Sequence, residues 1–251
     1  MRFFVKIGLD LGSRYVKAVF MEEGRLVDHR YYDTLSFYRD YGRKVDGELV
    51  VDYERLGWPS GVSITSTGYG RNLVKIAGGQ VIPELRAHTK GAVFQTGLTD
   101  FTLLDLGGQD SKVIKVSGGR MVDFRTNDKC AASSGRYLEN MATVLAMDVA
   151  ALGECRDNPV ELSSTCAVFG ESELIGQIIE GHPIEHLAAG VNRTIVKRVE
   201  PMLRELSSPV VVFTGGVAQS GAIRAMLAEA LGVQVILPAH PQLNGAIGCG
   251  V

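Results

Sequence analysis

Two matched stretches of the sequence place an aspartate, a glycine and a lysine at the same spacing. Residues 10–28 are DLGSRYVKAVFMEEGRLVD, and residues 105–123 are DLGGQDSKVIKVSGGRMVD. Aligned without a gap, the two 19-residue stretches agree at eight positions. Agreement in one register over this length indicates an internal duplication.

The Asp-Leu-Gly at the start of each copy has the chemistry of a phosphate and metal site. Glycine lets backbone N–H groups approach an anion closely, and carboxylates are the hard ligands that Mg²⁺ takes beside phosphates. We therefore predict that Asp10 and Asp105 hold Mg²⁺ and that two facing loops grip a polyphosphate. Ordinary hairpin turns in a duplicated fold are the alternative.

The pattern around each loop predicts the elements that position it. An alternating strand ends in Asp-Leu-Gly in both copies, with Val5, Ile7 and Leu9 in the first and Phe101 and Leu103 in the second. A second strand begins near the lysine, and a glycine turn leads into a third. Each half is thus expected to begin with an antiparallel three-strand meander.

A third glycine site follows a β-branched run at residues 210–214. Gly215 and Gly216 come directly after this run, and apolar residues at helical spacing follow them, namely Ile223, Met226, Leu227, Ala230 and Leu231. A strand, two glycines and a helix let a flat ring or a phosphate reach the backbone.

Two of the four cysteines precede predicted helices. Cys130 lies in the polar segment NDKCAASSGR, and Cys166 follows Ser163-Ser164-Thr165, whose hydroxyls suit a helix N-terminus. Helix N-termini favour the thiolate, which is the form that binds metals. Buried structural thiols are the alternative, and Cys155 and Cys249 lack this context, so we expect them not to be ligands.

Composition excludes several classes of function. The 251 residues carry a net charge of −2 and 22% charged side chains, which gives no electrostatic case for nucleic acid or an anionic membrane. No apolar run approaches the roughly 20 residues of a membrane span. The N-terminus passes into a strand pattern without a signal-peptide cleavage region, so a cytoplasmic protein is expected.

The loops together resemble the ATPase superfamily of sugar kinases, Hsp70 chaperones and actin. Residues 10–13 resemble its first phosphate loop, residues 105–110 its second, and Thr214-Gly215-Gly216-Val217-Ala218 its adenosine motif. This resemblance implies an α/β fold of two duplicated ribonuclease H-like domains that binds ATP or ADP with Mg²⁺. We expect the first domain at residues 1–97, the second at 98–239, and a return of residues 240–251 to the first.

The resemblance also implies roles for individual residues. Asp10 and Asp105 would hold Mg²⁺ through water, and either Gln109 or Asp110 would position the attacking water. Lys17 and Lys112 would reach phosphates or else be exposed strand residues. Phosphate oxygens would accept from the backbone N–H groups of Gly12, Ser13, Gly107 and Gly108, and the nucleoside would face Gly215, Gly216 and Val217.

A narrower resemblance rests on residues 127–132, NDKCAA, on residues 163–173, SSTCAVFGESE, on TGYGR at 67–71 and on DLGGQDSK. These segments are similar to the ATP-dependent activators of 2-hydroxyacyl-CoA dehydratases, the ATPase subunits of benzoyl-CoA reductase and the reductases of double-cubane cluster proteins. The resemblance implies a homodimer in which Cys130 and Cys166 of each chain hold one shared 4Fe–4S cluster. From the spacing alone, zinc bound by four thiolates across the dimer is an alternative.

Such a protein would hydrolyse ATP to drive single low-potential electrons from a ferredoxin or flavodoxin into an iron–sulfur acceptor enzyme of anaerobic metabolism. The sequence does not specify the acceptor. A small-molecule kinase of the same fold, and a non-catalytic switch or filament protein, are the rival interpretations.

Overall fold

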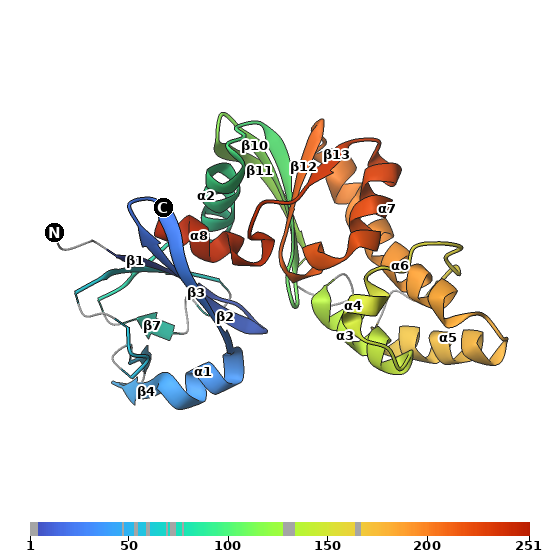
Figure 1. The fold of residues 1–251 in the computed structure, drawn as a ribbon, viewed down its shortest axis with the longest axis horizontal. Helices are drawn as coiled ribbons and strands as arrows, with labels where there is room; N and C mark the ends of the chain where they lie inside the picture. The colour runs from blue at the N-terminus through green and yellow to red at the C-terminus, as the bar shows by residue number, and fades with distance from the viewer. Residues whose placement is uncertain are drawn as a thin grey trace. The chain divides into compact units, whose positions relative to one another are not determined.

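The computed structural model describes residues 5–46, 48–52, 55–58, 61–68, 70, 74–76, 78–127, 134–163 and 167–251. The chain divides into two units, each built around a five-stranded sheet (Figure 1). The first unit comprises Met1–Thr99, Gly118–Met121 and Gln242–Val251, and the second comprises Asp100–Ser117 and Val122–Pro241.

The sheet of the first unit has the strand order β3-β2-β1-β6-β8. The predicted meander is present, because β1 pairs antiparallel with β2 and β2 with β3, whereas β6 runs parallel to β1 and β8 parallel to β6. The strands span Lys6–Leu11 (β1), Tyr15–Glu22 (β2), Arg25–Asp33 (β3), Ser63–Thr67 (β6) and Gln80–Val81 (β8).

A short helix and a small sheet follow the meander. Helix α1 (Thr34–Tyr41) begins at Asp33, whose carboxylate accepts a hydrogen bond from the Ser36 N–H and so caps the helix. The small sheet has the order β4-β5-β7, with strands at Gly42–Val45, Glu48–Val51 and Val74–Ile76.

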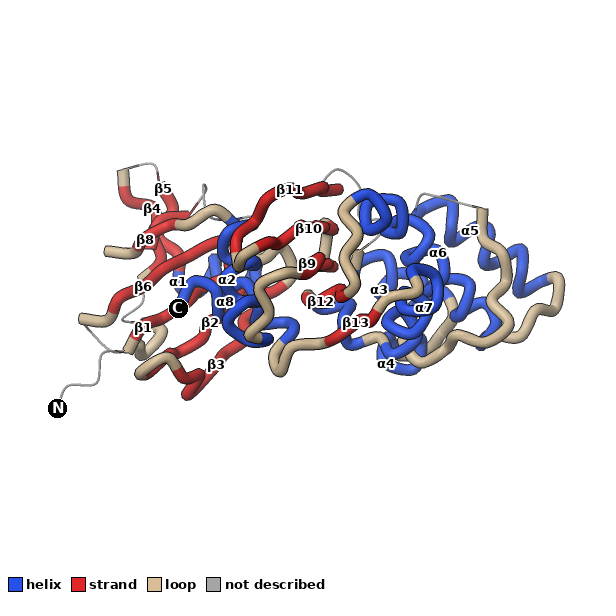
Figure 2. Tube along the Cα trace, turned by 90° about the horizontal axis from the view of Figure 1, so that it is seen from above, coloured by secondary structure: helices blue, strands red, loops and turns tan. Residues whose placement is uncertain are grey.

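Helices α2 (Glu84–Thr96) and α8 (Asn244–Gly250) lie side by side in the first unit (Figures 1 and 2). Their backbones approach so closely that a Cβ on Gly248 would lie 1.8 Å from the Ala87 carbonyl oxygen. A Cβ on Gly8 of β1 would likewise lie 2.0 Å from the Ala246 carbonyl oxygen. Glycine is therefore required where α8 meets its neighbours, and this packing ties the C-terminal residues to the N-terminal strand.

The sheet of the second unit repeats the arrangement in the order β11-β10-β9-β12-β13. Strand β10 pairs antiparallel with β9, whereas β12 runs parallel to both β9 and β13. The strands span Phe101–Leu106 (β9), Ser111–Ser117 (β10), Arg120–Asn127 (β11), Val210–Thr214 (β12) and Gln234–Ile236 (β13).

Helices follow the meander of the second unit, and their buried side chains join those of β9 and β12 in one core. The α-helices span Gly135–Val144 (α3), Val149–Leu152 (α4), Ala167–Ile179 (α5), Ile184–Glu205 (α6) and Gly221–Leu231 (α7), and two 3₁₀ turns span Gly216–Gln219 and Pro241–Leu243. No helix within the described ranges combines the length and the hydropathy needed to cross a membrane.

Helix α5 directly follows Cys166, at one of the two helix positions that the sequence predicts. Its Leu174 is buried, whereas Ile175, Ile178 and Ile179 are exposed. The α/β class and the duplicated meander are confirmed.

The close packing of α8 on α2 predicts a large effect of one methyl group. Gly248→Ala should lower the free energy of unfolding by about 3 kcal/mol, because the new Cβ forces two backbones apart. Gly176→Ala is the matched control, since its Cβ would meet nothing within 4 Å in α5, and it should raise stability by about 0.5–1 kcal/mol. Urea denaturation followed by circular dichroism measures both, and equal stabilities would contradict the packing argument.

Candidate functional site

A buried ion pair ends the central strand of the first unit. Asp10 of β1 lies opposite Lys17 of β2, and the Asp10 Oδ2 to Lys17 Nζ distance is 3.4 Å. Asp10 is only 4% exposed. A carboxylate held out of water needs a compensating charge, and the antiparallel register supplies it.

The second unit repeats the ion pair and adds a second carboxylate. Asp105 of β9 lies opposite Lys112 of β10, whose Nζ lies 3.7 Å from Asp105 Oδ2 and 2.6 Å from Asp110 Oδ2. Lys112 is 5% exposed, so the interpretation of this lysine as an exposed strand residue is wrong. Gln109, the other candidate for orienting water, is half-buried beside Asp110.

A threonine on the neighbouring parallel strand lies opposite each aspartate, and sequence reasoning missed both threonines as site residues. Thr214 of β12 donates a hydrogen bond from Oγ1 to Asp105 Oδ1 at 2.8 Å. Thr67 of β6 lies opposite Asp10, but its hydroxyl donates to the Ile82 carbonyl oxygen at 3.0 Å. The signal for this pair was a repeated Thr-Gly at residues 67–68 and 214–215.

The glycine after each threonine lies directly on the strand that carries the aspartate. Gly68 and Gly215 have φ values of +97° and +91°, where a side chain is strained. A Cβ on Gly68 would lie 2.6 Å from Asp10 Oδ1, and one on Gly215 would lie 2.1 Å from the Leu106 carbonyl oxygen. Both positions therefore require glycine for their backbone angle and for their close approach.

The start of α1 holds the first glycine loop in place. The Thr34 hydroxyl donates to the Gly12 carbonyl oxygen at 2.8 Å, and Arg14 Nη1 pairs with Asp33 Oδ2 at 3.0 Å. The loop residue Ser13 lies between these two anchors and is half-buried. Anchors on both sides of the loop fix its backbone without using the N–H of Ser13.

Tyr38 of α1 lies near Asp10. Its hydroxyl oxygen would lie 2.4 Å from a Cβ on Gly70. Burial, and next the negative charge of Asp10, raise the pKa of Tyr38 to about 12. The phenol therefore remains protonated at neutral pH.

The start of α3 holds the second glycine loop. The Gly107 N–H donates to the Asp110 carbonyl oxygen at 3.0 Å and closes the turn. The N–H groups of Gly135 and Arg136 donate to the carbonyl oxygens of Gly107 and Gly108 at 2.9 and 3.1 Å. The Gly107 N–H, which was expected to face phosphate, is thus engaged within the turn.

The third glycine site has one open position. Gly216 is exposed, and a Cβ there would meet nothing within 4 Å, whereas Gly215 is buried and its N–H donates to the Pro241 carbonyl oxygen at 3.0 Å. The Val217 side chain is buried in the core of the unit. Gly216 is therefore the residue of this turn with room for a flat ligand.

Cys130 and Cys166 lie outside the described residues. Of the other cysteines, Cys249 is buried, and burial followed by the negative charge of Asp10 raises the pKa of its thiol. Burial also raises the pKa of the Cys155 thiol. A higher pKa favours the thiol over the metal-binding thiolate. Across the described part of the chain, no group of three or more His, Cys, Asp and Glu side chains is arranged around a metal position.

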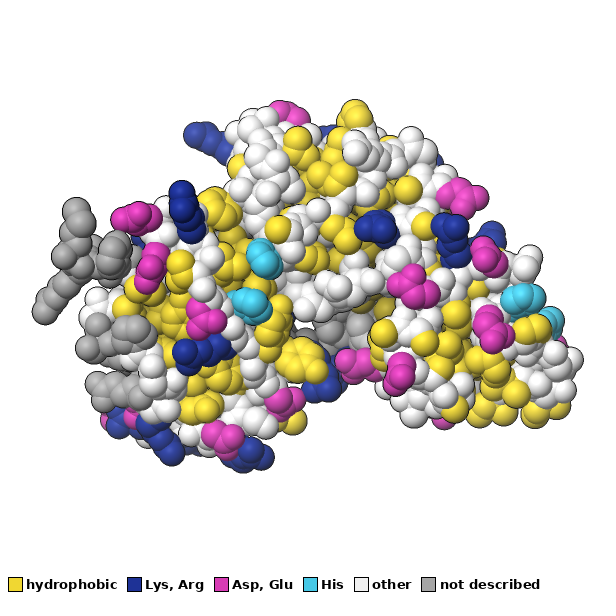
Figure 3. Space-filling view, in the orientation of Figure 1, with side chains coloured by type: hydrophobic (Ala, Val, Ile, Leu, Met, Phe, Trp, Pro, Cys, Tyr) yellow, Lys and Arg dark blue, Asp and Glu magenta, His cyan; other side chains and the backbone are white. Residues whose placement is uncertain are grey.

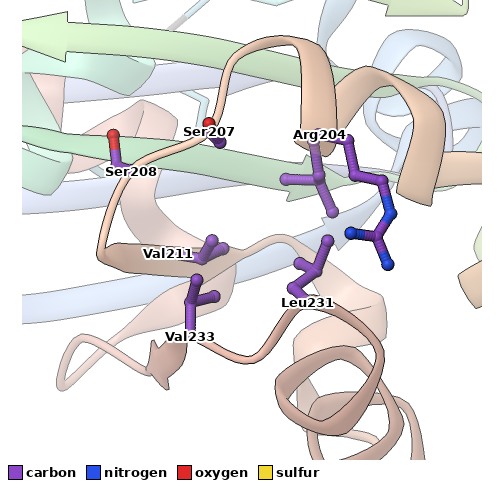
Figure 4. Close-up of a pocket in the computed structure, with 7 residues that line it drawn as sticks. Arg204, Ser207, Ser208, Val211, Leu231 and Val233 are labelled. Carbon is purple, nitrogen blue, oxygen red and sulfur yellow. The ribbon is translucent and has the colours of Figure 1, made fainter.

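A pocket of about 180 Å³ lies at the other end of β12 from Thr214 (Figure 4). Its arginine, Arg204, already pairs with Glu200 at 2.6 Å and donates to the Ala230 carbonyl oxygen at 2.6 Å. The pocket is lined by Leu203, Arg204, Ser207, Ser208, Val211, Leu231 and Val233. It holds none of the residues predicted for the site.

Comparison with known proteins identifies the family. A model of the BadF/BadG/BcrA/BcrD ATPase family matches residues 7–250. The chain belongs to this ATPase family. It is 38% identical over 257 residues to the 2-hydroxyisocaproyl-CoA dehydratase activator of Clostridioides difficile, covering 98% of this chain and 93% of that protein. It is 34% identical over 249 residues to the (R)-2-hydroxyglutaryl-CoA dehydratase activating ATPase of Acidaminococcus fermentans, covering 98% and 95%.

Solved structures confirm the fold. The activator of the 2-hydroxyisocaproyl-CoA dehydratase from Clostridium difficile with bound ADPNP superposes with a TM-score of 0.84 at 35% identity, covering 98% of this chain and 92% of that one. A ROK family glucokinase from Streptomyces griseus has a TM-score of 0.59 at 14% identity, covering 98% of each chain, which shows a shared fold alone. The resemblance to the activators within the sugar kinase-like fold is thus confirmed.

The hydrogen bond between Thr214 and Asp105 gives a prediction that tests the geometry alone. Thr214→Val should lower the free energy of unfolding by about 1.5–3 kcal/mol, because it removes a buried hydrogen bond to a charged group. Thr214→Ser keeps the hydroxyl and should retain most of this stability. Urea denaturation measures both variants, and a valine variant as stable as the serine variant would exclude the bond as a stabilising contact.

Proposed function

We propose that this chain is an ATP-hydrolysing reductive activator that drives low-potential electrons into a partner iron–sulfur enzyme. A buried Asp–Lys pair ends the central strand of both units. The same chain aligns over 98% of its length with dehydratase activators. This combination of a duplicated carboxylate site with full-length similarity supports the proposal.

The two carboxylates have the chemistry that Mg²⁺ requires. Lys17 Nζ lies 3.4 Å from Asp10 Oδ2, and Lys112 and Thr214 contact the Asp105 carboxylate. Hard oxygen ligands of fixed orientation suit Mg²⁺, which in nucleotide sites keeps several of its waters. We infer that Asp10 and Asp105 each take part in Mg²⁺ binding through water, where the ion would neutralise phosphate charge.

The backbone of the loops would bind the nucleotide itself. We assign phosphate contacts to the N–H groups of Gly12, Ser13 and Gly108, and a nucleoside contact to the exposed Gly216. Gln109 or Asp110 would orient the attacking water, since phosphoryl transfer depends on placement more than on covalent help.

Cys130 and Cys166 are proposed to bind a 4Fe–4S cluster shared by a homodimer. One chain supplies two such thiols and a cluster needs four, so a two-fold axis completes the set. When bound, the cluster would accept one electron from a ferredoxin or flavodoxin and pass it to the acceptor.

The helix that follows Cys166 carries an apolar surface suited to a protein partner. On α5, Ile175 and Ile178 are exposed and Ile179 is 81% exposed. Figure 3 shows hydrophobic side chains gathered on the surface over this helix. Exposed apolar patches of this kind mark protein interaction sites, which supports docking of an iron–sulfur enzyme near the cysteine-bearing segment.

Removal of either carboxylate charge should abolish most ATP hydrolysis. Asp10→Asn and Asp105→Asn should each lower kcat by about 100-fold or more, because the ligand for Mg²⁺ loses its charge while its shape is kept. A coupled phosphate-release assay measures the rate. Asp157→Asn, at an exposed position in the second unit, is the control and should leave kcat unchanged.

Iron analysis tests the redox part of the proposal. Protein purified without oxygen should contain about four irons per dimer and show an EPR signal on reduction. Cys130→Ala or Cys166→Ala should remove the iron, whereas Cys155→Ala and Cys249→Ala should retain it. Protein that stays free of iron after anaerobic reconstitution yet hydrolyses ATP would end the electron-transfer proposal, and phosphate transfer to small molecules would then be assayed.

A further inference from the structure

The Asp10 carboxylate lies close to the backbones of two glycines that are far apart in the sequence, Gly68 and Gly245. A Cβ on Gly68, just after β6, would lie 2.6 Å from Asp10 Oδ1, and a Cβ on Gly245, in α8, would lie 3.1 Å from Asp10 Oδ2. We call the space between these two glycines the carboxylate slot. A side chain at either position would compete with the carboxylate for its volume.

His88 of α2 faces the same slot. The point 3.1 Å from Asp10 Oδ2, where a Gly245 Cβ would sit, is also 3.1 Å from His88 Nε2 and 3.2 Å from its Cε1. His88 is 5% exposed. The His88 imidazole and the Asp10 carboxylate therefore border the same small space beside the Gly245 backbone.

The position of His88 is fixed by the packing of α2 on α8. Asn244 Nδ2 donates to the His88 carbonyl oxygen at 2.9 Å, and Asn244 Oδ1 accepts from Gln95 Nε2 at 3.0 Å. Gly91 leaves room for this contact, because its Cβ would lie 2.0 Å from the Asn244 carbonyl oxygen. The imidazole is thus presented to the slot by a rigid pair of helices.

The two units differ in the second group that lies beside the aspartate, in addition to its lysine. In the second unit the Thr214 hydroxyl bonds directly to Asp105. In the first unit the equivalent Thr67 hydroxyl bonds to Ile82 instead. In the first unit, His88 of α2 and Gly245 of α8 lie near the other carboxylate oxygen, Asp10 Oδ2.

We propose that His88 is a positioning residue for Asp10. Lys17 Nζ lies 3.4 Å from Asp10 Oδ2, and His88 Nε2 borders the space beside the same oxygen, so both groups would restrict rotation of the carboxylate. In this proposal His88 acts on the reaction through Asp10. The inference rests on the proposed function, because it is Mg²⁺ binding by Asp10 that this orientation serves.

Three variants separate positioning from packing. His88→Leu should lower kcat for ATP hydrolysis by about 10–100-fold and raise the Mg²⁺ concentration for half-maximal rate, as loss of a residue that orients a metal-binding side chain does. ADP affinity measured in EDTA should change less than about twofold. His88→Gln keeps a nitrogen donor and should recover most of kcat, whereas Gly245→Ala should reproduce the His88→Leu defect by filling the slot.

Thr89→Val is the matched control. It alters a buried residue next to His88 whose hydroxyl donates within α2, to the Leu85 carbonyl oxygen, and the rate of ATP hydrolysis should stay unchanged. If the leucine and glutamine variants lose kcat equally, or if either no longer binds ADP in EDTA, His88 serves only the packing of the unit and the proposal is wrong. A leucine variant as active as the wild type would overturn this inference alone, whereas a wild-type chain without ATPase activity would overturn the proposed function as well.

Discussion

A carboxylate kept out of water beside a lysine, near the end of the central strand, is the constraint on which each unit depends. Asp10 and Asp105 are 4% and 3% exposed. Leaving such a group without its partner costs about 3–5 kcal/mol. The hairpin register must therefore place Lys17 and Lys112 opposite them, because a shift by one residue would turn each lysine to the other face of the sheet. The meander in each unit is thus specified by electrostatics as well as by burial of its apolar side chains.

Close backbone approaches are the second consequence of these sites. Gly68 and Gly215 let the turn after the parallel strand lie on the strand that carries the aspartate. Gly248 and Gly91 let α8 and α2 meet backbone to backbone, which brings Gly245 beside Asp10. Because these contacts involve backbone atoms, a larger residue has no rotamer with which to avoid the clash. The rigidity around Asp10 therefore derives from glycines spread along the whole chain.

The sequence predicted the elements that local patterns encode, but not the contacts between segments that are far apart in the chain. The repeat at residues 10–28 and 105–123 located both meanders, since strand alternation and turn glycines are local signals. It did not reveal that Thr214 bonds to Asp105 or that His88 faces Asp10, because those side chains arrive from strands and helices far along the chain. For α5, the sequence predicted a helix after Cys166 but not that Ile175 and Ile179 would be exposed.

The differences between the two copies carry more information about function than the agreements. Both copies keep the aspartate, the lysine that pairs with it and a glycine with positive φ. The lysine compensates the burial of the carboxylate, and the glycine lets the adjacent turn lie close to the central strand. The copies differ in the group beside the carboxylate, since a hydroxyl bonds to Asp105 and an imidazole faces Asp10. A hydroxyl donates one directed bond and fixes one oxygen, whereas the position of the His88 imidazole depends on how α2 and α8 are packed. We therefore infer that the orientation of Asp10 is coupled to the helices of its unit, whereas Asp105 is bonded to Thr214 on the neighbouring strand of its sheet.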